Sequence, residues 1–111
     1  MPADTNPLGD IFGGWLMCQM DLAAGSVAAR RAEGRAVTIS AESMTFLRPV
    51  KVGDEVSVYA SLESTGRTSM RINVEAWRRP RHTALAEKVT EAAFTFVAVD
   101  DDGRPRPLPK A

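Results

Sequence analysis

The sequence contains very little cysteine and histidine: Cys18 and His82 are the only examples in 111 residues. A single cysteine excludes a disulfide within the chain and suits a reducing compartment, so we expect a cytoplasmic protein. His82 has no second histidine with which to ligate a metal or share a proton. Zinc-ligand spacings, phosphate-binding loops and dinucleotide fingerprints are also missing. We therefore expect neither a metal nor an organic cofactor.

Net charge and long apolar runs are missing as well. The chain balances 14 basic against 14 acidic residues, so its overall field does not recruit nucleic acid. The longest apolar runs fall far short of the roughly 20 residues that span a bilayer, and no charged-then-apolar leader is visible. We expect neither nucleic acid nor a membrane as a partner. An anionic ligand would need a local cluster of arginines.

The length of the chain predicts one domain over residues 1–111, without internal repeats. Hydrophobic residues make up 44% and charged residues 25%, as in ordinary globular proteins. A domain of this size buries a modest core, so additional burial by self-association is expected.

The hydrophobic period divides the chain into a helical part and a strand part. From Gly13 or Gly14 to about Glu33 the apolar residues fall near helical spacing, and Gly34 follows where a terminating glycine belongs. A period of two then predicts strands over 36–47, 55–62, 70–77 and 88–99. The short connections between them require antiparallel pairing. The order of elements predicts an α+β hotdog fold, in which a curved antiparallel sheet wraps around one long helix.

Gly13 and Gly14 begin the predicted helix, where backbone amides lack partners and the helix dipole is positive. Such an amide can stabilise the oxyanion that forms during acyl transfer. A second interpretation is that the two glycines only let the helix pack tightly on the sheet.

Asp21 lies in the middle of the same helix among apolar neighbours. Aspartate is a mediocre residue for a helix interior, and a buried carboxylate is costly unless it is paired or used. These properties indicate a catalytic carboxylate. The alternative is a solvated acid on an exposed stripe of the helix.

The spacing of these two features restricts how they can cooperate. Asp21 follows Gly13 by eight residues, which is about 12 Å along a helix, whereas catalytic contacts need about 3 Å. If both act on one carbonyl, Asp21 of one chain must face Asn6 and Gly13 of a partner across a two-fold interface.

Three parts of the chain resemble a known family: residues 1–21, residues 42–54 and residues 94–100. The first contains Asn6-x-x-Gly9-x-x-x-Gly13-Gly14, and the last reads Phe-Thr-Phe-Val-Ala-Val-Asp. Together they resemble the YciA-type hotdog acyl-CoA thioesterases over nearly the whole chain. Members of that family begin with one more strand, so the resemblance implies that a first strand is missing or trimmed here.

The resemblance implies hydrolysis of acyl-CoA to a free acid and coenzyme A by a hexamer of three dimers. It further implies that Asn6 positions the water or the thioester, that the Gly13 amide polarises the carbonyl, and that Asp21 is base or nucleophile. Coenzyme A is then part of the substrate rather than a cofactor. The rival hypothesis is a non-catalytic acyl-CoA-binding hotdog module, against which the joint presence of Asn6 and Asp21 argues.

Further candidates concern substrate binding. Gly14 adjoins the proposed oxyanion site, and the turn in relatives that corresponds to Arg67, Thr68 and Ser69 lies near coenzyme A. Arg78 and Arg79 belong to a local basic cluster that suits phosphates. Each arginine equally fits a solvated hairpin end.

Overall fold

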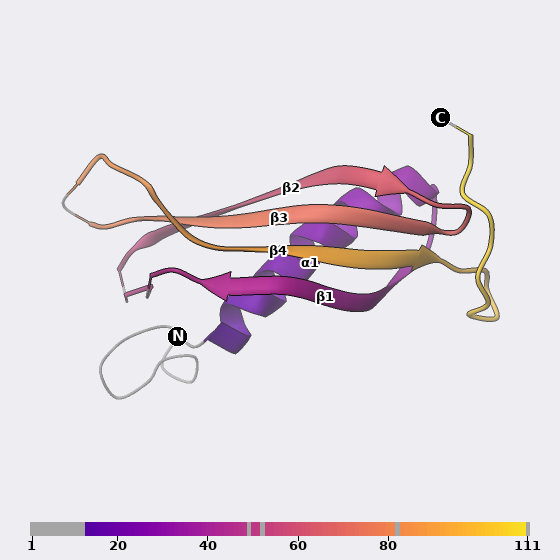
Figure 1. The fold of residues 1–111 in the computed structure, drawn as a ribbon, viewed down its shortest axis with the longest axis horizontal. Helices are drawn as coiled ribbons and strands as arrows, with labels where there is room; N and C mark the ends of the chain where they lie inside the picture. Colours follow the sequence, from indigo (N-terminus) through magenta and orange to yellow (C-terminus); the bar gives the residue numbers. More distant parts are fainter. Residues whose placement is uncertain (1–12, 49, 52, 82, 111) are drawn as a thin grey trace.

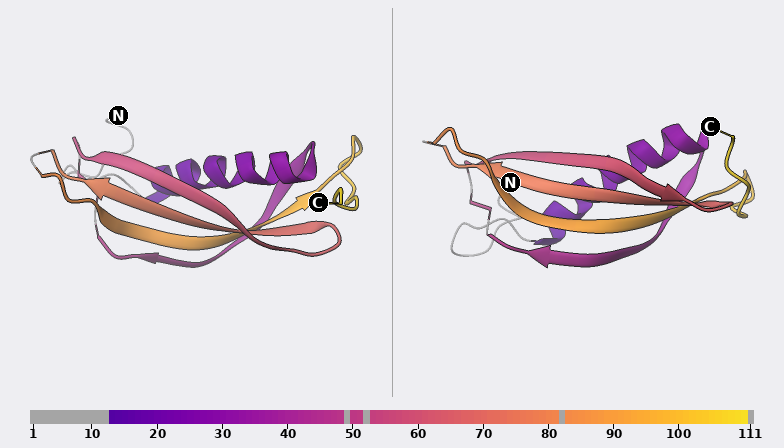
Figure 2. Two further views of the ribbon diagram at one scale, coloured as in Figure 1. Left: turned by 90° about the horizontal axis from the view of Figure 1, so that it is seen from above. Right: turned by 45° about the horizontal axis from the view of Figure 1, so that its top comes forward.

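The computed structural model describes residues 13–48, 50–51, 53–81 and 83–110. One helix precedes four strands: α1 (Gly13–Ala32), β1 (Ala36–Phe46), β2 (Glu55–Thr65), β3 (Ser69–Arg79) and β4 (Glu87–Ala98). The strands pair antiparallel in the order β1-β4-β3-β2, so β1 and β2 form the two edges of this sheet. Figure 1 shows α1 crossing behind the sheet, and Figure 2 shows it lying along one face of the curved strands. The predicted architecture is confirmed.

Helix α1 packs on the sheet through a stripe of residues spaced by four. The buried members are Leu16, Met20, Ala24, Ala28 and Ala32. Three of the five are alanines, so the helix backbone can approach the strands closely. The opposite side of the helix is less covered, because 41% of Met17 and 66% of Leu22 are exposed. The helix therefore presents a second apolar surface that the described part of the chain leaves open.

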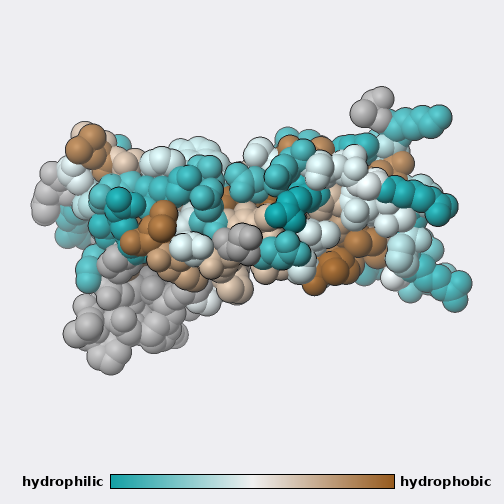
Figure 3. All heavy atoms as spheres, viewed as in Figure 1, coloured by the Kyte–Doolittle hydropathy of each residue, from teal (hydrophilic) through white to brown (hydrophobic). Residues whose placement is uncertain are grey.

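The sheet has one apolar and one polar face, as its period of two predicts. On β3 the buried residues Met70, Ile72, Val74 and Ala76 alternate with less buried ones, among them Arg71, Glu75 and Trp77. The buried set belongs to the core under α1. We call the other side the outer face. Figure 3 looks onto it and shows a largely hydrophilic surface.

Helix α1 ends in a Schellman motif centred on Glu33. The N–H of Glu33 donates to the Arg30 carbonyl oxygen at 3.3 Å. The N–H of Gly34 donates to the Ala29 carbonyl oxygen at 3.2 Å, which completes the motif. Glu33 adopts the left-handed conformation, with φ at 54°, so the prediction that Gly34 fills this position is wrong by one residue.

The segment after β4 folds back over the end of α1. Arg106 donates from Nη2 to the Ala32 carbonyl oxygen at 2.8 Å and from Nε to the Val99 carbonyl oxygen at 3.0 Å. Arg31 donates to the Pro109 carbonyl oxygen at 2.7 Å. A helix end leaves carbonyls without intrahelical partners, and Arg106 satisfies one of them. Gly34 makes room for this arginine, since a Cβ there would lie 2.7 Å from Arg106 Nη2.

Glu33→Gly should raise the free energy of unfolding by about 1 kcal/mol, because glycine adopts the left-handed conformation without the steric cost that other residues carry. Glu33→Ala is the matched control: it removes the same side chain but keeps a Cβ, so it should bring no such gain. Urea unfolding at one fixed protein concentration measures both. Equal stabilities of the two variants would show that the backbone conformation of Glu33 carries no cost.

Candidate active site

Asp21 is anchored to the sheet by a hydroxyl. Its Oδ1 accepts a hydrogen bond of 2.7 Å from Thr38 Oγ1, which lies on the edge strand β1. Asp21 is half-buried, on the side of α1 that faces this strand. The hydrogen bond itself is exposed, so water still reaches the Asp21 carboxylate. The contact restrains the orientation of the carboxylate, which suits the interpretation of Asp21 as a catalytic residue.

A mainly apolar hollow of about 520 Å³ adjoins Asp21. Met17, Cys18 and Leu22 contribute from α1, and Thr38 and Ala41 from β1. Phe94 of β4 completes the lining. Asp21 is the one carboxylate among these residues, so the site offers a fixed acid beside a surface suited to a hydrocarbon group. We call it the Asp21 hollow.

Thr38 is the site residue that the sequence did not identify. It pairs with Phe96, an inward-facing residue of β4, so the hydroxyl lies on the side of β1 that faces the helix. A polar side chain at an inward position of the predicted strand 36–47 was the available signal. The sequence pattern does not predict that Thr38 contacts Asp21, because that contact depends on how α1 packs against β1.

Crowding by neighbouring atoms does not explain the glycine at position 14, in the first turn of α1. A Cβ built on Gly14 meets nothing within 4 Å among the described residues. Tight packing against the described part of the chain therefore does not require a glycine here. The first turn of α1 also contains no acidic side chain, which leaves the positive end of the helix dipole uncompensated by its own residues.

Gly13 and Asp21 do not meet within one chain. Helix α1 runs without a break from Gly13 to Ala32, so the spacing of about 12 Å derived from the sequence applies. Asn6 lies outside the described residues. The structure thus brings Asp21 together with Thr38 and keeps it apart from the helix start.

The predicted coenzyme-binding residues fall into two groups. Thr68 and Ser69 lie where β3 begins, next to the exposed Arg67, whereas Arg78 and Arg79 lie where β3 ends. Eleven residues of strand separate the groups by about 33 Å. One phosphate cannot contact both groups of the same chain.

The predicted arginines differ in the ion pairs that they form with other described residues. Arg78 is largely buried and forms ion pairs with Asp54 at 3.7 Å and Glu87 at 3.2 Å. Arg79 pairs with Glu55. The side chain of Arg67 forms no ion pair with the described residues. Arg67 is therefore the cation of the predicted set that needs no rearrangement to meet a phosphate.

Among the described residues, no group of three or more histidine, cysteine, aspartate or glutamate side chains is arranged to hold a metal ion. No helix of this part of the chain is long and apolar enough to cross a membrane.

Comparison with known proteins gives consistent matches. Residues 8–85 match the family model described as the thioesterase superfamily. The acyl-CoA thioester hydrolase YciA of Salmonella typhimurium is 54% identical over 112 residues, which cover 98% of this chain and 84% of that protein. The hexameric thioesterase y2039 of Yersinia pestis is 52% identical, with a TM-score of 0.91, over 100% of this chain and 90% of that one.

A further solved structure matches at lower identity. It is the hexameric hotdog fold thioesterase Cj0915 of Campylobacter jejuni, at 38% identity and a TM-score of 0.90. The alignment covers 98% of this chain and 84% of that one.

Gly14→Ala should leave the free energy of unfolding unchanged or slightly higher, because the added Cβ meets no described atom within 4 Å and alanine has a higher helix propensity than glycine. Gly34→Ala is the comparison, since its Cβ must displace Arg106 and should lower stability. Urea unfolding of both variants measures the difference. A marked loss of stability in Gly14→Ala would show that packing alone demands the glycine.

Proposed function

The chain belongs to the thioesterase superfamily, and we propose that it hydrolyses acyl-coenzyme A thioesters to a free carboxylic acid and coenzyme A. The observation that carries this proposal is Asp21, fixed by Thr38 at the edge of an apolar hollow. A protein that only binds acyl groups needs no oriented carboxylate at that place. Relatives of this chain are named acyl-CoA thioester hydrolases, which supports hydrolysis over binding alone.

In the proposed reaction the acyl group lies in the Asp21 hollow and its thioester carbonyl points at the start of a helix. Asp21 either takes a proton from water, which then attacks the carbonyl carbon, or attacks that carbon itself. The carbonyl oxygen gains the negative charge, and the Gly13 amide stabilises it. The carbon–sulfur bond then breaks. If water attacked, the free acid forms and coenzyme A leaves with the proton that Asp21 took from that water. If Asp21 attacked, an acyl–Asp21 anhydride forms and coenzyme A leaves as the thiolate; water then hydrolyses the anhydride to the free acid, and the proton released restores the Asp21 carboxylate and neutralises the thiolate. Thr38 keeps the carboxylate oriented throughout.

The helix geometry makes this a site of two subunits. Since about 12 Å separates Gly13 from Asp21 in one chain, the Gly13 amide and Asn6 must come from a second copy. In the sheet of described strands, β1 is an edge, and no described strand pairs with its outer backbone groups. Beside it lie exposed apolar side chains, with Ile39 at 60% and Leu22 at 66% exposure. A second copy that pairs along β1 would cover them and close the Asp21 hollow.

The proposal extends to assembly and substrate binding. Two solved relatives are described as hexameric thioesterases, and we expect this chain to form a hexamer of three such dimers. We assign coenzyme A phosphates to Arg67, with Thr68 and Ser69 beside it, and retain Arg78 and Arg79 as contacts from another subunit. Coenzyme A belongs to the substrate, so we expect no cofactor. A cytoplasmic location fits the lone Cys18.

Asp21→Asn should lower turnover of acyl-CoA by at least about a hundredfold, the usual scale for loss of a general base, while the fold and the Thr38 contact persist. Thiol release from short, medium and long acyl-CoAs measures the effect, and circular dichroism checks the fold. Asp101→Asn is the control, because it removes an exposed carboxylate in a remote turn. Near-parent turnover by Asp21→Asn would remove this residue from the mechanism. No thiol release by the parent on any chain length would refute the activity itself.

A further inference from the structure

The segment after β4 also contacts the turn between β2 and β3. The N–H of Leu108 donates to the Arg67 carbonyl oxygen at 2.9 Å, and the N–H of Ala98 donates to the Thr68 carbonyl oxygen at 2.9 Å. We call residues 104–110 the C-terminal strap. Figure 1 shows it in yellow, passing the β2–β3 turn at the end of the molecule where α1 finishes. The strap therefore reaches the turn to which the proposed function assigns phosphates of coenzyme A.

The strap is itself fixed to the rest of the chain on both sides of Leu108. Arg106 donates to carbonyl oxygens at the end of α1 and just after β4. The Pro109 carbonyl oxygen accepts a hydrogen bond of 2.7 Å from Arg31. The Leu108 side chain is partly buried against the hydrophobic core. Because these contacts hold the strap, its N–H meets the turn at a defined place.

The contact with the strap orients the peptide group between Arg67 and Thr68. The N–H and C=O of a trans peptide point in opposite directions, and no cis peptide bond occurs among the described residues. Since the Arg67 carbonyl points to the strap, the Thr68 N–H points away from it. No described residue accepts a hydrogen bond from this N–H. The turn thus offers a free amide beside the exposed Arg67 guanidinium and the hydroxyls of Thr68 and Ser69, which are donors that suit a phosphate.

The strand register places this turn nearer to the proposed active site than the other end of β3. Thr38 and Met70 each pair with Phe96, so they lie in one row across the sheet, two strand spacings apart. Arg67 precedes Met70 by three residues, which puts its Cα about 14 Å from that of Thr38. The same construction gives about 31 Å for Arg79. Within one chain, the Arg67 turn is therefore the group that lies nearer to the thioester.

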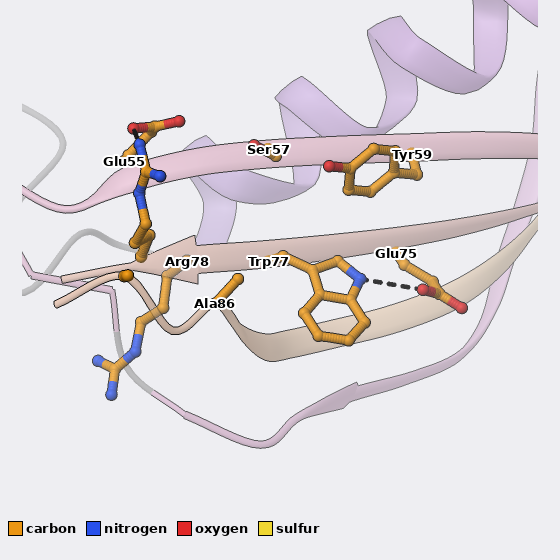
Figure 4. Close-up of a pocket in the computed structure, with 9 residues that line it drawn as sticks. Glu55, Ser57, Tyr59, Glu75, Trp77, Arg78 and Ala86 are labelled. Carbon is orange, nitrogen blue, oxygen red and sulfur yellow. Dashed lines mark hydrogen bonds and ion pairs between the residues drawn. The ribbon is translucent and has the colours of Figure 1, made fainter.

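The other end of β3 is less suited to a phosphate. A hollow of about 510 Å³ lies there on the outer face, and its lining includes the rings of Tyr59 and Trp77 and two carboxylates. Figure 4 shows one of these acids, Glu75, beside Trp77, whose Nε1 donates to it at 3.0 Å. The other acid, Glu55, is paired with Arg79. A phosphate at this end would have to displace a carboxylate, whereas the β2–β3 turn requires no such exchange.

We propose that Leu108 is a positioning residue for coenzyme binding: its N–H holds the peptide between Arg67 and Thr68 in the orientation that a phosphate of acyl-CoA meets. This inference rests on the proposed function, because it takes the Arg67 turn as the phosphate site. A residue that acts in this way sets the affinity for the coenzyme and does not touch the chemistry at Asp21. Its signature is a change in KM for acyl-CoA with little change in kcat.

Leu108→Pro removes the N–H, and residue 108 already favours an extended backbone that proline can adopt, because Pro109 follows it. Leu108→Ala is the matched control: both variants lose the leucine side chain, but alanine keeps the donor. In Leu108→Pro, KM for acyl-CoA and Kd for coenzyme A alone should rise about three- to tenfold, the scale of one lost hydrogen bond. The rise in Leu108→Ala should be clearly smaller. Thiol release measures KM and kcat, and isothermal titration calorimetry measures Kd.

Two further variants connect the effect to the turn and to the strap. In an Arg67→Ala background, which should itself raise KM, Leu108→Pro should add less than it does in the parent, because the cation that it positions is gone. Arg106→Lys keeps the charge but lacks the planar fork that joins two carbonyl oxygens, so the strap loosens and KM should rise with kcat retained. This variant carries the test if circular dichroism shows that Leu108→Pro does not fold.

Parent values of KM and Kd in folded Leu108→Pro, or equal rises in Leu108→Pro and Leu108→Ala, would overturn the inference. So would an effect of Leu108→Pro that is undiminished in the Arg67→Ala background, or a parent KM in Arg106→Lys when Leu108→Pro does not fold. A parent KM in Arg67→Ala would place the phosphates elsewhere and remove the inference, yet its thiol release would uphold the proposed hydrolysis. If the parent released no thiol, the Kd for coenzyme A would still test the strap.

Discussion

The unbroken helix α1 holds its first residues and Asp21 about 12 Å apart, and this separation shapes the rest of the molecule. The helix cannot bend to shorten it, because a stripe of residues at every fourth position packs against the sheet from Leu16 to Ala32. The first turn of α1 contains no carboxylate of its own that could act beside the helix start. If the Gly13 amide and Asp21 act on one carbonyl, they must therefore come from different copies.

Strand β1 of the sheet combines two features that bear on this constraint. Strand β1 is an edge, so its outer backbone groups and its apolar side chains remain available to a partner. The same strand carries Thr38, which fixes Asp21 next to the Asp21 hollow. The open edge, on which a second subunit is proposed to pair, and Thr38, which orients Asp21, therefore belong to the same strand. Under the proposed mechanism, assembly and catalysis are linked through β1, and a separate monomer would lack half of the catalytic groups.

Sequence periodicity predicted the fold because the apolar residues follow helical spacing in α1 and alternate with polar residues in the strands. The change from helical to two-residue spacing after Gly34 located α1 and all four described strands to within a few residues. The sequence placed the residue that terminates the helix one position too late. Glu33 adopts the left-handed conformation although glutamate has no preference for it, because two capping hydrogen bonds stabilise that conformation.

The candidate site was only partly predictable. Asp21 and the glycine pair stood out because they conflict with a helix interior or with ordinary helix propensity. Thr38 did not, since one hydroxyl in a strand is unremarkable until the fold places it opposite Asp21. The opposite locations of Arg67 and Arg79 follow from the length of β3, but the ion pair of Arg79 with Glu55 depends on the strand register. Outward-facing Tyr59 and Trp77 were visible as alternation, whereas the hollow between them was not.

The claim that two subunits share one active site is tested most directly by mixing two impaired variants, Asn6→Ala and Asp21→Asn. The two are unfolded and refolded together, and thiol release is compared with that of each variant alone. In a mixed dimer one site carries both lesions and the other is intact, so activity should return towards roughly a quarter of the parent value for random pairing. No recovery, with subunit exchange proven by mass spectrometry, would contradict the shared site.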